Sequence, residues 1–123
     1  MKLAVTALVA TYRRPRELAR LLDSLAAIAS GLARVVVVDN SSSAEVKAVV
    51  EAARCPAHYV DPGKNLGCGG GLQLAGRRAQ ELSGEDGTHF VILDDDAVLA
   101  PDSLEILAAA MEEIGRASCR ERV

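Results

Sequence analysis

Four consecutive valines, at positions 35–38, constrain the fold of this chain more than any other feature of its sequence. A strand with one face in water alternates apolar and polar side chains, and this run does not alternate. An unbroken β-branched run is typical of a central strand in a parallel sheet, which helices bury on both faces. The run therefore predicts an α/β fold.

Strands and helices are expected to alternate around this run. Strands are expected at residues 3–10, 35–38, 58–60 and 90–93, of which the third is short. Helical patterns follow them and begin at Pro15, at a capping box of Ser42 and Glu45, at Leu72 and at Pro101. This order predicts a Rossmann-like parallel sheet with flanking helices and right-handed crossovers.

The charge and the cysteines exclude several classes of function. The formal net charge is −3 and neither sign dominates, so no nucleic-acid partner is expected. The three cysteines, Cys55, Cys68 and Cys119, form no CxxC pair, so neither a disulfide framework nor a zinc site is supported. A reducing compartment is therefore favoured. We expect the protein in the cytoplasm, either free or held peripherally at the inner membrane face.

The start of the chain allows two interpretations. Lys2 and the mostly apolar residues 3–10 imitate a signal peptide, but the run is short and Arg13, Arg14 and Pro15 follow directly. A buried first strand explains the run better. No segment approaches the roughly 20 apolar residues that a membrane helix needs.

The end of the chain changes character after the fourth helical pattern. That pattern has an apolar stripe of Leu104, Leu107, Met111 and Ile114. Residues 115–123 lack the stripe and carry three arginines. They are either a disordered end or foreign sequence joined to a truncated gene. Their resemblance to translated sequencing-adapter DNA favours truncation.

Polar residues gather where three of the expected strands end. They occupy residues 11–14, 39–41 and 94–96. Ligands of open α/β sheets bind beyond the C-terminal ends of the strands. A glycine-rich loop, residues 61–71, precedes the third helix and could close over the same edge. This convergence is the main indication of a ligand site.

Three adjacent aspartates follow the fourth expected strand. If the chain stays extended there, Asp94 and Asp96 point the same way and Asp95 points the opposite way. Two carboxylates on one face can hold Mg²⁺ or Mn²⁺, and the ion would neutralise a substrate diphosphate. The alternative is a solvated acidic turn. Metal binding is favoured because the aspartates directly follow a buried apolar run.

The other candidates stay ambiguous on local sequence alone. Asp39 is as consistent with accepting a hydrogen bond from a base or ribose as with forming a turn. Residues 65–71 either allow close backbone approach to a phosphate or sugar, or form a flexible connection. Arg13, Arg14 and Lys64 are candidate phosphate partners, although surface basic side chains are usually only solvated.

Four motifs together resemble those of family 2 glycosyltransferases, which have the GT-A fold. The motifs are residues 9–15, 36–41, 65–67 and 93–96. Each motif is weak alone, but their order and spacing are specific. The resemblance covers residues 1–114, which would form the N-terminal, nucleotide-sugar-binding half of a GT-A domain. The glycine loop and triple aspartate are most similar to the rhamnosyl- and galactofuranosyltransferase-like branch.

The resemblance implies roles for the residues that hold the donor. Thr11 and Tyr12 would line the base pocket largely through their backbone, and Asp39 would bind uracil or another base. Asn65 and the glycines near Gly67 would cover the ribose and diphosphate.

The resemblance also implies a metal site and leaves one position open. Asp94 would touch ribose or metal, and Asp96 would hold the metal, Mn²⁺ or Mg²⁺. Arg13 would belong to the donor site, but the family usually has Asn at this position. The resemblance therefore does not establish that Arg13 contacts the donor.

The implied reaction is transfer of a sugar, with inversion, from a UDP- or dTDP-sugar to a glycan or lipid-linked acceptor. The family's catalytic base lies well downstream of the triple aspartate, and only 27 residues follow Asp96. We therefore expect a truncated chain that lacks the base and is inactive alone. Half a GT-A domain also leaves a sheet edge uncovered, which favours self-association.

Three alternatives belong to other classes. A dinucleotide-dependent oxidoreductase needs glycines at the first strand–helix turn, and residues 11–15 contain none. A receiver-like phosphoacceptor domain needs acids there, where Arg13 and Arg14 stand. A nucleotide-binding α/β module without catalysis remains close to the main interpretation.

Overall fold

The computed structural model describes residues 5–28, 31–83 and 89–121, in which strands and helices alternate along the chain. The strands are β1 (Val5–Thr11), β2 (Leu32–Asp39), β3 (Ala57–Val60) and β4 (His89–Ile92). The helices are α1 (Pro15–Ala26), α2 (Ala44–Glu51), α3 (Gly67–Ser83) and α4 (Ser103–Glu121). The strands lie in the order β3-β2-β1-β4, and all neighbours are parallel. The predicted α/β fold is confirmed.

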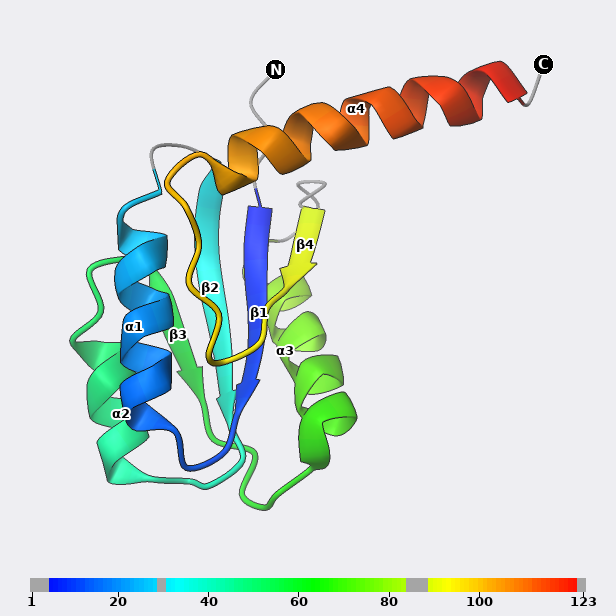
Figure 1. Cartoon of the computed structure of the whole chain (residues 1–123). Coiled ribbons are helices and arrows are strands. Elements are labelled where there is room, and N and C mark those ends of the chain that lie inside the picture. The colour runs from blue at the N-terminus through cyan, green and yellow to red at the C-terminus, as the bar shows by residue number, and fades with distance from the viewer. Residues whose placement is uncertain (1–4, 29–30, 84–88, 122–123) are drawn as a thin grey trace.

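Alternate residues of β2 fill two separate cores, which explains why the valine run has no polar position. Val35 and Val37 pack with residues of α1 and α2 on one face of the sheet. Val36 and Val38 pack with residues of α3 on the other face (Figure 1). All four valines are completely buried. The prediction of a strand covered on both faces is therefore confirmed.

The segment after β4 returns across the sheet face that α1 covers (Figure 1). Leu93, Ala97 and Leu99 pack against the same core as α1. The Leu99 N–H donates to Ser24 Oγ of α1 at 3.1 Å. This path carries the aspartate motif across β1, where Asp95 contacts Thr11, before the chain turns back toward α4.

The N-cap of helix α2 lies one residue later than predicted. Its N-cap is Ser43, whose Oγ accepts hydrogen bonds from two N–H groups of the first turn. Ser42 instead has a φ of 49° and donates to Asp61 Oδ1 at 2.6 Å. The cause is Asp39, which accepts the Ser43 N–H at 2.8 Å and so draws the chain into a tighter turn.

Helix α3 begins at Gly67, so the glycines expected in a loop are helical. The helix needs them because it lies very close to the strand ends. A Cβ on Gly71 would lie 3.0 Å from Ala10 Cβ and 3.1 Å from Asn40 Nδ2. Glycine therefore serves close packing at this position.

We expect Gly71→Ala to destabilise the chain by about 1–3 kcal/mol, because the added methyl group must push α3 away from β1. The free energy of unfolding in urea measures this effect. Gly69→Ala is the matched control, since a Cβ at Gly69 meets nothing within 4 Å. That substitution should stabilise by about 0.5–1 kcal/mol, because alanine is the better helix former. Equal effects of the two substitutions would contradict the packing argument.

Helix α4 is less buried than its apolar stripe suggested. Leu104 is buried, but Leu107 and Met111 are 44 % and 41 % exposed. The helical backbone runs to Glu121 and so crosses the boundary expected at residue 114. The separate origin of residues 115–123 stays a prediction. Among the residues described, no helix combines the length and hydropathy that crossing a membrane requires.

Candidate functional site

A cleft of about 530 Å³ opens where β1, β2 and β4 end and α3 begins. Its walls come from four segments that are far apart in the sequence. The lining residues are Ala10, Thr11, Tyr12, Arg14, Asn40, Asn65, Gly67, Cys68, Leu72, Ile92, Leu93, Asp94, Asp95 and Asp96. The structure thus brings the predicted polar clusters together at the C-terminal edge of the sheet, where α/β folds bind ligands.

Most residues predicted to hold the donor or the metal line this cleft. They are Thr11, Tyr12, Asn65, Gly67, Asp94 and Asp96. Arg13 and Asp39, which were predicted with them, lie outside the lining. Their ligand contacts stay predictions, and the structure shows what each of them contacts instead.

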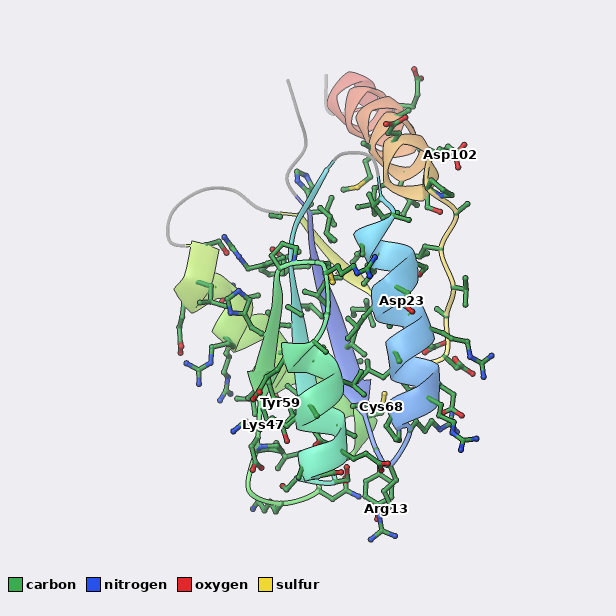
Figure 2. All side chains as sticks on the ribbon, turned by 90° about the vertical axis from the view of Figure 1, so that its left-hand side faces the viewer. Arg13, Asp23, Lys47, Tyr59, Cys68 and Asp102 are labelled. Carbon is green, nitrogen blue, oxygen red and sulfur yellow. The ribbon has the colours of Figure 1, made fainter. Side chains whose placement is uncertain are left out.

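Arg13 points away from the cleft and stacks on Tyr12. Its guanidinium carbon lies 5.0 Å from the centroid of the Tyr12 ring, a cation–π distance. Figure 2 shows Arg13 projecting outward where β1 ends. The residue has a φ of 54°, and this left-handed backbone turns the chain from β1 into α1. Arg14, the next residue, lines the cleft in its place.

Asp39 is completely buried, and its carboxylate is already engaged by the protein. Oδ1 accepts the Ser41 N–H at 3.0 Å and the Ser41 hydroxyl at 2.5 Å. Oδ2 accepts the Ser43 N–H at 2.8 Å and the Tyr59 hydroxyl at 2.7 Å. A carboxylate offers about four acceptor positions, so this set is full. Asp39 therefore orders the turn into α2, and binding a base would require the Ser41 hydroxyl to turn away.

Tyr59 donates one of the four hydrogen bonds that the Asp39 carboxylate accepts, and we call these residues the Asp39 cluster. Burial raises the pKa of Tyr59, and the hydrogen bond to Asp39 with the charges of Asp39 and Asp61 raises it further. Lys47 lies 6.0 Å from the ring centroid, and Figure 2 shows the two side chains next to each other. Tyr59 is thus a neutral donor at physiological pH, as the Asp39 carboxylate requires.

Asn40 fastens the start of α3 to the end of β2, a role the sequence alone did not single out. Its Nδ2 donates to the Gly67 carbonyl at 3.0 Å, and its Oδ1 accepts the Leu66 N–H at 3.1 Å. The alternating direction of side chains along β2 could have indicated this role. Val38 faces α3, so Asn40 faces α3 as well, and Asp39 points to the other side.

The aspartate motif forms a turn, yet its side chains alternate as predicted for extended chain. The Ala97 N–H donates to the Asp94 carbonyl at 3.1 Å, which closes the turn. Asp94 and Asp96 are exposed, whereas Asp95 is half-buried. Odd-numbered neighbours such as Leu93 pack inward in the same way. The first and third carboxylates therefore face solvent at the cleft.

The middle aspartate contacts β1 and the start of α1. Thr11 Oγ1 donates to Asp95 Oδ2 at 2.9 Å. Arg14 Nη1 lies 3.6 Å from Asp95 Oδ1 and 3.8 Å from Asp96 Oδ2. Arg14 is therefore the cation beside the acidic turn. Arg14 was predicted only as a candidate phosphate partner, and Asp95 was predicted to point away from the metal-binding pair.

The described residues could hold a divalent cation only if a substrate supplied some of its ligands. No group of three or more His, Cys, Asp or Glu side chains in the described part of the chain could hold a metal ion. Mg²⁺ is commonly held by one or two carboxylates together with substrate phosphates. Asp94 and Asp96 meet that lesser requirement because both are exposed at the cleft. A diphosphate would supply the remaining oxygen ligands.

Comparisons with known proteins give one family and one fold. The family model described as Glycosyl transferase family 2 matches residues 6–120. The crystal structure of S. aureus TarS 1–349 has a TM-score of 0.72 and 25% identity, over 90% of this chain and 33% of that chain. The mannosyltransferase PcManGT from Pyrobaculum calidifontis, in complex with GDP-Man and Mn²⁺, has a TM-score of 0.68 and 25% identity, over 85% and 31%.

A third structure, S. aureus TarS 1–349 in complex with UDP-GlcNAc, has a TM-score of 0.70 and 23% identity, over 90% of this chain and 32% of that chain. The chain thus spans about a third of the length of these structures. No curated protein matches it.

Proposed function

The chain belongs to glycosyl transferase family 2, and on this basis we propose that its cleft binds the nucleotide diphosphate part of a sugar donor. One observation carries the proposal: two exposed carboxylates, on Asp94 and Asp96, share the cleft with the first turn of α3. The N–H groups at a helix start favour an anion, and Asn40 holds that helix start in place.

The acidic turn makes a metal ion part of this proposal. A diphosphate beside three carboxylates would be repelled unless a cation lay between them. Arg14 supplies one positive charge at this place, against the three aspartates. When bound, Mn²⁺ or Mg²⁺ would be held by Asp94 and Asp96 and would neutralise the leaving diphosphate. The Mn²⁺ in the mannosyltransferase complex supports this assignment.

We further propose that the donor is a UDP- or dTDP-sugar and that the family reaction is transfer with inversion. In such a transfer, a base removes the proton of an acceptor hydroxyl on a glycan or lipid-linked acceptor, and the diphosphate leaves from the opposite face of the sugar. The carboxylates among the described residues that line the cleft are those of the acidic turn. Since these are assigned to the donor side, we propose that this chain binds donor without transferring sugar.

Calorimetric titration with UDP, dTDP and GDP, each with and without Mn²⁺, tests the donor site. We expect UDP or dTDP to bind more tightly when Mn²⁺ is present. GDP is included because the mannosyltransferase neighbour binds GDP-Man. NADH is the control ligand for the dinucleotide-binding alternative. Tighter binding of NADH than of any diphosphate, without a metal requirement, would contradict the proposal.

Incubation of the chain with Mn²⁺, UDP- or dTDP-sugars and candidate acceptors tests the catalytic part separately. The expected result is donor binding without transfer. Robust turnover would show that a base is present in this chain and would overturn that part of the proposal.

Strand β4 lies at one edge of the sheet that the described residues form, and we expect copies of the chain to associate there. Phe90 and Ile92 on this strand are 39 % and 62 % exposed, and an edge strand offers unpaired N–H and C=O groups to another chain. Light scattering should show species larger than a monomer at micromolar concentration. Phe90→Lys should shift the population toward monomer, since a charge on an edge strand opposes such pairing. A monodisperse wild-type monomer would contradict the expectation.

A further inference from the structure

We propose that Asp95 is a positioning residue of the donor site: bonded to β1, it holds the acidic turn so that the carboxylates of Asp94 and Asp96 stay exposed at the cleft, where a cation would bind. The inference rests on the proposed function and explains how the site keeps its shape. All three aspartates line the cleft, but the inference gives the exposed pair to the cation and Asp95 to its bonds with Thr11 and Arg14.

The surroundings of Asp95 differ from those of its neighbour. The Asp95 side chain is 14 % exposed, whereas that of Asp96 is 59 % exposed. Asp95 Oδ2 accepts the Thr11 hydroxyl at 2.9 Å, and Oδ1 lies 3.6 Å from Arg14. One oxygen is therefore directed at the last residue of β1 and the other at the residue before α1. A cation could bind Asp95 only by displacing these partners.

Leu93 and Ala97 hold the two ends of the turn by packing, but strand pairing stops just before the aspartates. Among the described residues, the last main-chain bond from this strand to β1 runs from the Leu93 N–H to the Leu8 carbonyl, at 3.0 Å. The Ala97 N–H bonds within the turn itself, to Asp94. The bond between Thr11 and Asp95 joins residues 84 positions apart and fixes the turn to the rest of the fold.

Arg14 adds electrostatic support to this anchor. Its guanidinium lies within 4 Å of carboxylates on both Asp95 and Asp96, which reduces the repulsion between them. The Arg14 side chain is 54 % exposed, so water and salt weaken these pairs. The Thr11 hydrogen bond is consequently the main attachment, and it is the contact to remove in a test.

Hydrogen exchange tests the anchor without any ligand. In Thr11→Val and in Asp95→Asn, we expect the Ala97 amide to exchange about five- to tenfold faster, the ratio that loss of one ordinary hydrogen bond gives. The Val37 amide in β2 reports global unfolding and should change little. Thr11→Ser keeps the hydroxyl and should exchange like wild type. Asp23→Asn is the charge control, because Asp23 is an exposed carboxylate on α1 (Figure 2).

Titration of UDP in the presence of Mn²⁺ tests the consequence for the site. We expect Thr11→Val and Asp95→Asn to weaken the Mn²⁺-assisted affinity about tenfold, as when an outer partner of a metal ligand is lost. Thr11→Ser should restore it. Because Thr11 itself lines the cleft, the quantity to compare is the ratio of the UDP affinities with and without Mn²⁺. This ratio should fall about tenfold in both variants and should be kept by Thr11→Ser.

The possible outcomes separate this inference from the proposed function. Faster Ala97 exchange in both variants, with rescue by Thr11→Ser, supports the positioning role. Unchanged exchange in both variants overturns it, and if Asp95→Asn then also abolishes the effect of Mn²⁺, Asp95 is a direct ligand. If wild type shows no Mn²⁺-dependent UDP affinity, the metal-assisted donor site fails, while the exchange data still decide whether Asp95 anchors the turn.

Discussion

Replacing both Asp94 and Asp96 with Asn is expected to abolish the gain in UDP affinity that Mn²⁺ provides. Asparagine keeps the size of each side chain but removes the anionic oxygens that a hard divalent cation requires. The affinity for UDP in the presence of Mn²⁺ should fall about 10–100-fold or more. Loss of an outer partner of a metal ligand already has an effect of that size. Calorimetric titration of UDP with and without Mn²⁺ measures it directly.

The matched control is the double substitution Asp23→Asn and Asp102→Asn. Both residues are exposed carboxylates, and Figure 2 shows them away from Arg13 and the end of β1. The control changes the net charge of the chain equally but should leave the Mn²⁺ effect intact. UDP binding without metal should be unchanged or slightly tighter in the Asp94 and Asp96 variant, because two repelling charges are gone. A full Mn²⁺ effect in that variant would remove the chemical basis of the proposed function.

Asp39→Ala is expected to lower the free energy of unfolding by roughly 3–5 kcal/mol. The substitution leaves the N–H groups of Ser41 and Ser43 and the hydroxyl of Tyr59 without their acceptor. A buried donor without a partner costs about 1–3 kcal/mol, and these three part-buried donors should each cost near the lower end of that range. Tyr59→Phe removes only one of these bonds and should cost about 1 kcal/mol. Urea denaturation of both variants measures the difference. Similar small losses in the two would show that Asp39 is not the centre of this cluster.

The same cluster predicts how stability depends on alkaline pH. The pKa of Tyr59 is raised in the folded chain, so the folded state holds this proton more tightly than the unfolded state. The contribution is fully present below the ordinary tyrosine pKa of about 10 and is lost as pH rises through the higher folded value. Wild type should therefore lose more stability than Tyr59→Phe above about pH 10, measured by denaturation at several pH values.

Much of the fold could be predicted because burial leaves a periodic trace in the sequence. The run at residues 35–38 fixed the central strand and the presence of helices on both faces. The same period of two separated Asp95 from Asp94 and Asp96, and the burial of these residues follows it. The ends of elements were less predictable. The N-cap was predicted at Ser42 but lies at Ser43, because the Asp39 carboxylate accepts the Ser43 N–H and tightens the turn before α2.

The position of the candidate cleft could be predicted, but not every side chain that lines it. Arg13 and Arg14 are adjacent and chemically alike, yet Arg13 has a left-handed backbone and stacks on Tyr12, whereas Arg14 lines the cleft. Asp39 and Asn40 divide in the same way, because successive strand residues point to opposite faces. In both pairs the residue predicted to hold the donor contacts the protein itself, while its neighbour lines the cleft.

The sequence by itself determined the layers of this protein and the edge of the sheet at which its polar residues meet, because local periodicity and strand ends are written in neighbouring positions. Only the tertiary structure decided which of those residues touch one another. The bonds from Thr11 to Asp95 and from Asn40 to Gly67 join segments 84 and 27 positions apart. Such contacts depend on the path of the chain between the segments, and no local pattern records that path.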